Sequence, residues 1–116
     1  MLICLMVFVM MLMSCKKHEW KGVYSGIETY QAVSAMDTVN SSFQQTVTVD
    51  FKGTKCHFNS QTLIWEFKSK EKHKTGYTYD DGNTTFEISF EQDSLFARYS
   101  TTELDQLISR NFSGKK

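Results

Sequence analysis

The sequence predicts an all-β domain: a small antiparallel up-and-down barrel of eight strands that follows a cleaved N-terminal signal segment. Apolar and polar residues alternate with a period of two through most of the chain after residue 20. β-branched and aromatic residues, which suit a half-buried pleated surface, are frequent there. Short turn sequences separate the alternating runs, and such connections join antiparallel neighbours. A two-layer sandwich of the same strands is the alternative.

The first element is an unbroken apolar run over residues 2–13, LICLMVFVMMLM. A membrane-spanning helix needs about 20 apolar residues, and this run is shorter. Its length suits the hydrophobic region of a secretory signal. No Lys or Arg precedes the run. Either the α-amino group of Met1 alone supplies the positive charge that an export signal needs, or the true start of the chain lies upstream of Met1. An uncleaved anchor or a buried strand is the alternative interpretation.

The run ends at Leu12-Met13-Ser14-Cys15, which resembles the lipobox of bacterial lipoproteins. This resemblance implies that residues 1–14 are a signal peptide and that Cys15 is lipidated after cleavage. Residues 15–20 would then be a lipidated tether, and residues 21–116 the barrel domain. Two or three acyl chains would anchor the domain firmly to a membrane, since a single chain binds only marginally.

The strands of the barrel are predicted from the alternation. In one of them, Phe86, Ile88 and Phe90 alternate with polar residues. The turns contain Gly53 and Gly82, at positions where a tight hairpin requires positive φ. The predicted strands are 21–30, 43–52, 55–59, 62–68, 73–79, 84–91, 94–101 and 107–113. The segment 33–42 is predicted to be a polar loop, the longest connection in the chain.

The C-terminal stretch is ambiguous. The sequence from Thr102 to Asp105 is typical of a helix start, and Leu104, Leu107 and Ile108 have helical spacing. The residues from 108 to 114 instead suit a last strand. We favour the strand, with one turn of helix before it.

Three short motifs resemble a known family. Trp20–Gly26 (WKGVYSG), Gln45–Val49 (QTVTV) and Asn111–Lys116 (NFSGKK) are similar to the opening, second and closing strands of the calycin-like barrel lipoproteins of the Bacteroidetes. The resemblance implies a lipocalin-like barrel, and the family has no common activity. Some of its members carry an acidic stretch after the lipidated Cys that accompanies display on the outside. The sequence KKHE at residues 16–19 differs from that stretch, which predicts a periplasm-facing anchor.

Composition and residue spacing exclude several functions. The chain has 13 Lys+Arg and 13 Asp+Glu, so no basic excess favours nucleic acid. His18, His57 and His73 are isolated and do not form a metal-ligand pattern. Cys56 and His57 are adjacent in a predicted strand and point to opposite faces, so they do not form a nucleophile pair. Cys56 is predicted to be a small buried hydrophobe. We therefore predict no enzyme activity, no metal and no cofactor.

Two local clusters have ordinary interpretations. The sequence DDGN at residues 80–83 lacks the spaced oxygens of a calcium loop and is predicted to be a hairpin turn. Lys68, Lys70, Lys72 and Lys74 are predicted to form a solvated turn that blunts a sheet edge. The alternative for these lysines is contact with lipid head groups or an anionic partner.

The aromatic residues suggest what such a barrel could bind. An eight-stranded barrel has room for packed side chains or for one small ligand. We expect a non-catalytic, lipid-anchored envelope protein that binds a small hydrophobic ligand. The alternative is a protein-interaction lipoprotein with a filled barrel, an inhibitor or an envelope-assembly partner, acting through a loop such as 33–42. The candidate ligand-binding residues are Tyr24, Trp65, Phe67, Tyr77, Tyr79, Phe90 and Tyr99.

Overall fold

A computed structural model describes residues 19–116, and the predicted signal peptide and Cys15 lie outside the described residues. Within residues 19–116 no helix has the length and apolar character needed to cross a membrane. The all-β prediction is confirmed. The elements are β1 (Gly22–Val33), β2 (Thr38–Lys52), β3 (Lys55–Asn59), β4 (Ile64–Phe67), the 3-10 helix η1 (Ser69–Glu71), β5 (Lys72–His73), β6 (Gly76–Asp80), β7 (Thr84–Glu91), β8 (Ser94–Glu103) and β9 (Gln106–Lys115).

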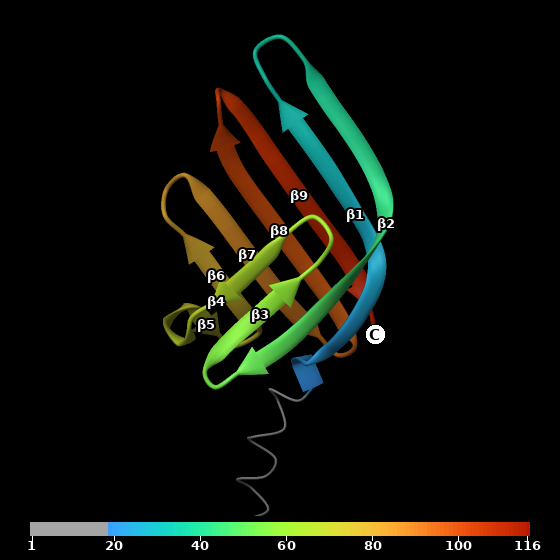
Figure 1. Ribbon diagram of the computed structural model, residues 1–116, viewed down its shortest axis with the longest axis vertical. Coiled ribbons are helices and arrows are strands. Elements are labelled where there is room, and N and C mark those ends of the chain that lie inside the picture. Colours follow the sequence, from blue (N-terminus) through green and yellow to red (C-terminus); the bar gives the residue numbers. More distant parts are fainter. Residues whose placement is uncertain (1–18) are drawn as a thin grey trace, which may run out of the picture.

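The strands form one antiparallel sheet in the order β4-β3-β2-β1-β9-β8-β7-β6-β5. Strands that follow one another in the chain pair with one another, except for β4 and β5, and β1 also pairs with β9. The sheet curls so that β3, β4 and the lower part of β2 cross in front of β7, β8 and β9 (Figure 1). The result is a nearly closed up-and-down barrel, as the alternation predicted.

The seam of the barrel lies between β4 and the β5–β6 hairpin, which are the two ends of the sheet. Side chains, and not a hydrogen-bonded ladder, close this seam. The ring centroids of Trp65 and Tyr79 lie 5.1 Å apart, and those of Phe67 and Tyr77 lie 5.4 Å apart. The first pair is edge-to-face and the second is tilted, and aromatic pairs at such distances are favourable beyond the area that they bury.

The strand count differs from the prediction because the predicted strand 73–79 is divided. Lys72 and His73 form β5 and pair with Tyr77 and Gly76 at the start of β6, which gives nine strands in place of eight. This short hairpin follows η1, where the Lys68 amide donates to Glu71 Oε1 at 2.7 Å. The lysines therefore lie around a turn at one end of the sheet, as predicted.

The prediction of a loop over residues 33–42 was wrong. β1 continues to Val33 and β2 begins at Thr38, with a tight turn in which the Ser34 amide donates to the Asp37 carbonyl at 2.8 Å. The register is regular along this hairpin, with Tyr30 opposite Ser41. Most residues from 35 to 44 are exposed. A strand with little burial needs no apolar alternation, and so the pattern did not reveal it.

The preference for a C-terminal strand is confirmed, but the predicted helical turn before it is wrong. Leu104 and Asp105 have φ of 47° and 65° and connect β8 directly to β9. Two successive left-handed residues are the signature of a tight hairpin turn. Gly53 and Gly82 also have positive φ, 63° and 88°, in their predicted turns.

Two glycines bring β1 onto β9. Gly26 lies directly opposite Gly114 in the register of these strands. A Cβ atom on Gly26 would collide with the backbone carbonyl of Ser113, and one on Gly114 would lie 2.8 Å from the carbonyl oxygen of Ser25. The close approach of the two backbones therefore requires glycine at this point of closure.

Candidate functional site

The predicted aromatic residues lie together in the barrel core. Tyr24, Phe67 and Tyr77 are fully buried, Phe90 is buried, and Trp65, Tyr79 and Tyr99 pack against them while partly exposed. At the end of the core near the start of β1, the Tyr24 hydroxyl donates to the Trp20 carbonyl at 2.7 Å. The Trp20 ring stacks on Phe90 with centroids 4.7 Å apart. Trp20, which the sequence placed in the tether, thus belongs to the core.

The upper end of the core is closed by Trp65. Its ring lies edge-on to Tyr79, Phe86 and Tyr99, with centroid distances of 5.1, 5.4 and 6.2 Å. The void beside these rings measures about 10 Å³ and is lined by Phe58, Tyr99 and other core residues. A space of this size holds about one water molecule. The aromatic residues that sequence reasoning selected therefore fill the barrel.

Burial keeps two phenols and a thiol of the core protonated near neutral pH. Desolvation is the main cause that raises the pKa of Tyr24 and of Tyr77 to about 12, with smaller contributions from Asp93 at Tyr24 and from Cys56 at both. Burial also raises the pKa of the Cys56 thiol to about 12. The thiolate is the nucleophilic form, so this raised pKa keeps Cys56 in the less reactive thiol form at neutral pH. The prediction that it is a small buried hydrophobe is confirmed.

A polar cluster that the residue patterns did not predict lies at the rim of the core. Arg110 Nη1 donates to Glu28 Oε2 at 3.1 Å, and Thr62 Oγ1 donates to Glu28 Oε1 at 2.7 Å. The guanidinium carbon of Arg110 lies 4.6 Å from the centroid of the Tyr30 ring. The cluster therefore ties the β3–β4 connection, through Thr62, to the adjacent strands β1 and β9. Its role is to hold the curled sheet together.

A signal for this cluster was present in the alternation. Glu28 follows Tyr24 and Gly26 at the same parity, so it occupies an inward position of β1. Arg110 shares the inward face of β9 with Phe112. A charged residue at an inward position needs a partner of opposite charge. The two strands are far apart in the sequence, so only their pairing in the sheet identifies the partner.

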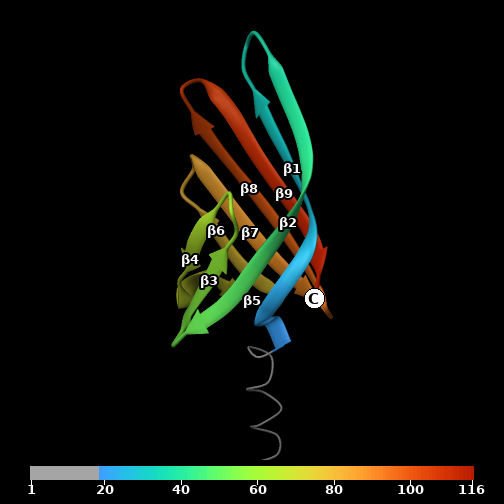
Figure 2. The ribbon, with the colours of Figure 1, turned by 45° about the vertical axis from the view of Figure 1, so that its right-hand side comes forward.

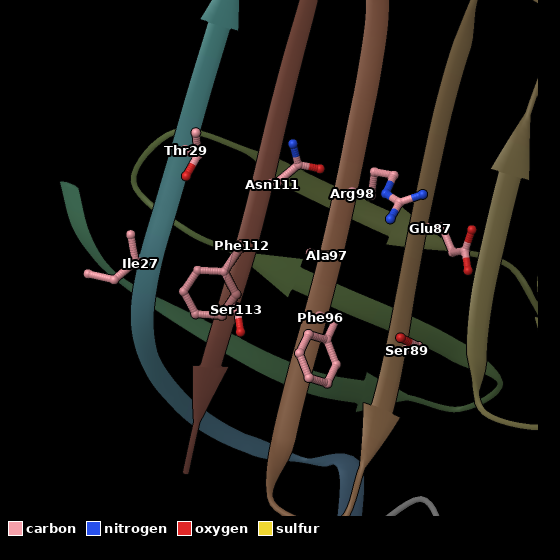
Figure 3. A pocket seen from close by; sticks show the side chains of 10 residues that line it. All are labelled: Ile27, Thr29, Glu87, Ser89, Phe96, Ala97, Arg98, Asn111, Phe112 and Ser113. Atoms are coloured by element: carbon pink, nitrogen blue, oxygen red, sulfur yellow. The ribbon is translucent and has the colours of Figure 1, made fainter. Parts of the chain in front are cut away.

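The outer face of the sheet carries a groove of about 390 Å³ over β1, β9, β8 and β7. Figure 3 looks onto this face, with β2, β3 and β4 passing behind it. Ser113 lies opposite Ile27 on β1 and opposite Phe96 on β8. Ile27 is 47% exposed and Phe96 43%. These two side chains form an apolar stripe with Ser113 between them.

A polar row runs beside the apolar stripe. Glu87 lies opposite Arg98, Arg98 opposite Asn111, and Asn111 opposite Thr29. Glu87 and Arg98 form no salt bridge in the described residues, although they are cross-strand neighbours. Their polar groups therefore face solvent along the groove. The sequence signal for this site was Ile27 and Phe96, large apolar residues at outward positions of their strands.

A second hollow of about 470 Å³ adjoins the groove and shares Ile27 with it. Its other lining residues are uncharged: Ser25, Gly26, Gln44, Gln45, Thr46 and Gln61. The outer face is thus hollowed from β7 to β2. Together these two hollows form a continuous concave surface over β7, β8, β9, β1 and β2.

The remaining polar residues are arranged as structural groups. His57 Nε2 lies 3.6 Å from Glu66 Oε2 on the neighbouring strand. Asp81 accepts hydrogen bonds from the amides of Asn83 and Thr84, which confirms a hairpin turn there. Residues 19–116 contain no group of three or more His, Cys, Asp or Glu side chains placed to hold a metal ion.

Comparisons of the chain with protein-family models, with curated proteins and with solved structures found no match. The resemblance to the calycin-like lipoproteins therefore stays a prediction that depends on three short motifs. The all-β, nearly closed barrel is established by the structure itself.

Proposed function

We propose that this chain is a lipid-anchored, non-catalytic protein of the bacterial envelope that binds a partner protein on the outer face of its barrel. The observation that carries the proposal is the contrast between a filled interior and a hollowed exterior. The space beside the core rings, lined by Phe58, Phe86 and Tyr99, measures about 10 Å³, whereas the outer groove measures about 390 Å³. This contrast favours the protein-interaction hypothesis over the small-ligand hypothesis.

A ligand inside the barrel would need far more space. Pockets for small molecules are typically about 300–1,000 Å³ and enclose most of the ligand surface. The rings of Trp65, Phe67 and Phe86 occupy the space where such a ligand would lie, with centroids 5.0 to 6.3 Å apart. Admitting a ligand would require several close-packed rings to move together.

The chemistry of the groove defines the partner that it fits. The stripe of Ile27 and Phe96 offers exposed apolar contact, and such contacts commonly mark interaction sites. Arg98 offers a guanidinium that forms no salt bridge in the described residues. Arginine pairs well with carboxylates through two parallel hydrogen bonds. We therefore expect a protein segment that carries an apolar side chain next to an Asp or Glu.

The membrane attachment is proposed from the sequence. Cleavage after Ser14 would leave Cys15 to carry the lipid, and residues 16–19 would link it to the folded domain. Because Trp20 is held in the core, this linker is short. The absence of an acidic stretch after Cys15 favours an anchor that faces the periplasm. Replacement of Cys15 by Ala in the full chain should release the protein from membranes or leave it unprocessed. An unchanged mature mass would contradict the lipidation.

The interaction is tested by photocrosslinking in cells of the native host. A photoreactive amino acid at position 96 of the full chain should give a discrete adduct with one envelope protein. The same probe at position 64 is the matched control, because Ile64 is 77% exposed but lies on β4, away from the groove. Arg98→Glu should reduce the adduct at position 96 by about 10-fold, since it opposes the partner's carboxylate.

Three outcomes would contradict this proposal. The first is equal adducts from positions 96 and 64, and the second is an adduct that Arg98→Glu leaves unchanged. The third is a native mass spectrum of the mature protein that shows a reproducible small molecule lost on denaturation. That result would restore the hypothesis of a bound hydrophobic ligand.

A further inference from the structure

The upper part of β2 is a free edge of the sheet. β2 pairs with β1 from Thr38 to Val49, but it pairs with β3 only from Thr48 to Lys52. Residues 38–47 therefore have a neighbouring strand on one side only. Figure 1 and Figure 2 both show this part of β2 as the outer margin of the sheet, above the β3–β4 hairpin.

Two side chains reveal which backbone groups point outward. The amide of Thr38 donates to Asp37 Oδ1 at 2.8 Å, and the amide of Thr46 donates to Gln45 Oε1 at 3.2 Å. Amides that bind side chains in this way point away from β1. Because direction alternates along a strand, Asn40, Ser42 and Gln44 also direct their N–H and C=O groups outward. Within residues 19–116 no hydrogen-bond partner is found for these outward groups.

This edge lacks the devices that usually prevent strand pairing. Proteins protect free edges with lysine, proline, bulges or covering segments. No charged residue lies between Asp37 and Asp50, and the chain contains no proline. The register of β2 against β1 runs without interruption, so no bulge is present. The other end of the sheet differs, because Lys68, Lys70, Lys72 and Lys74 surround β5 there.

We propose that a second copy of this chain pairs with the free edge, β2 against β2, in antiparallel orientation about a two-fold axis at Ser42. In this register Ser42 meets its counterpart, and Asn40 of each copy meets Gln44 of the other. Each such pair exchanges both main-chain hydrogen bonds, so the pairing forms about six of them.

The edge is self-complementary, and this is why the occupant is a second copy. The two capped residues, Thr38 and Thr46, lie at equal distances on either side of Ser42 along the strand, so the open groups are symmetric about it. A two-fold axis places identical side chains opposite each other at its centre. Like charges there would be unfavourable, and this segment carries none.

The pairing would extend one sheet into the other and keep their outer faces on the same side. The two-fold axis is then perpendicular to the sheet, and the grooves over β7–β8–β9–β1 open in the same direction. This inference does not depend on what those grooves bind.

The first test is disulfide crosslinking of the full chain in membranes. In the proposed register the Cα atoms of the two Ser42 residues lie about 5.5 Å apart, within the range that a disulfide spans. Mild oxidation of Ser42→Cys should therefore give a covalent dimer. Thr85→Cys is the matched control, because Thr85 is equally an exposed strand residue but lies on β7, inside the sheet. Its oxidation should give no dimer.

The second test is the oligomeric state of the full chain in detergent, measured by native mass spectrometry. The unaltered chain and Thr85→Lys should be dimeric, whereas Ser42→Lys should be monomeric with an unchanged circular dichroism spectrum. A monomeric unaltered chain would overturn the proposal, and so would a dimer that Ser42→Lys leaves intact. Equal crosslinking of Ser42→Cys and Thr85→Cys would also overturn it.

Discussion

Glu28 and Arg110 are 82 residues apart in the chain, yet Glu28 Oε2 and Arg110 Nη1 lie 3.1 Å apart at the rim of the core. The Glu28 side chain is only 5% exposed and that of Arg110 is 26% exposed. Thr62 donates a further hydrogen bond to the same carboxylate. A buried carboxylate is tolerated because these donors replace the water that it lost.

Removal of the arginine alone should destabilise the fold strongly. Arg110→Leu leaves the Glu28 carboxylate buried without its main partner, and we expect a loss of about 3 kcal/mol in the free energy of unfolding. The double variant Glu28→Leu/Arg110→Leu removes both charges and should recover most of this loss. Urea unfolding followed by fluorescence of Trp20 and Trp65 measures both values. Equal losses in the single and double variants would contradict this role of the pair.

A side chain at Gly26 should weaken the pairing of β1 with β9 that closes the barrel. The Cβ of Gly26→Ala would collide with the Ser113 carbonyl, so β1 and β9 must separate locally. We expect a destabilisation of about 3 kcal/mol. Gly53→Ala is the control, because its Cβ meets no atom within 4 Å and only its positive φ is unfavourable, at a cost of about 1 kcal/mol. Equal thermal unfolding temperatures for the two variants would contradict the close-approach explanation.

The barrel should lose stability in alkaline solution. The pKa of Tyr24 and of Tyr77 is raised from 10.0 to about 12 by burial. The contribution of the protonated phenols is fully present below pH 10 and is lost as the pH rises through 12, because unfolding then releases protons. The urea concentration at the unfolding midpoint should therefore decrease as the pH is raised from 10 to 12. Tyr77→Phe should weaken this dependence, whereas an unchanged slope would show that other groups cause it.

The β6–β7 turn should weaken in acid. Hydrogen bonds from the amides of Thr84 and Asn83 hold the pKa of Asp81 below its ordinary value of 3.8. The carboxylate therefore contributes stability above pH 3.8, and this contribution is lost as the pH falls through the lower pKa of the folded state. The measurement is the hydrogen-exchange rate of the Thr84 amide below pH 3.8, corrected for its intrinsic dependence on pH. Asp81→Asn should make this corrected rate nearly independent of pH. Glu91→Gln, at the far end of β7, should leave its dependence on pH unchanged.

The strands that the sequence predicts correctly are those with one face in the core and the other in solvent. Strands such as β7 and β8 have one side in the core and one in solvent, and their alternation located them to within a few residues. The β1–β2 hairpin beyond Glu28 is largely exposed, so polar residues occupy both faces and the pattern was interpreted as a loop. The C-terminal turn was misassigned because Leu104 and Asp105 combine helical spacing with left-handed φ angles.

Local residue patterns were enough to predict the strand-rich class, the short antiparallel connections and the aromatic set that fills the core, because these depend on neighbouring residues and on burial. The contacts that depend on the pairing of β1 with β9 could be seen only in the folded chain. This pairing brings Glu28 to Arg110 and places Ile27 and Phe96 on either side of Ser113 on the outer face. The upper edge of β2 stays open for a separate reason, because β3 pairs only with Thr48–Lys52 and is too short to cover the rest. Contacts between strands at opposite ends of a chain are set by how the sheet closes, and no local pattern of residues encodes that closure.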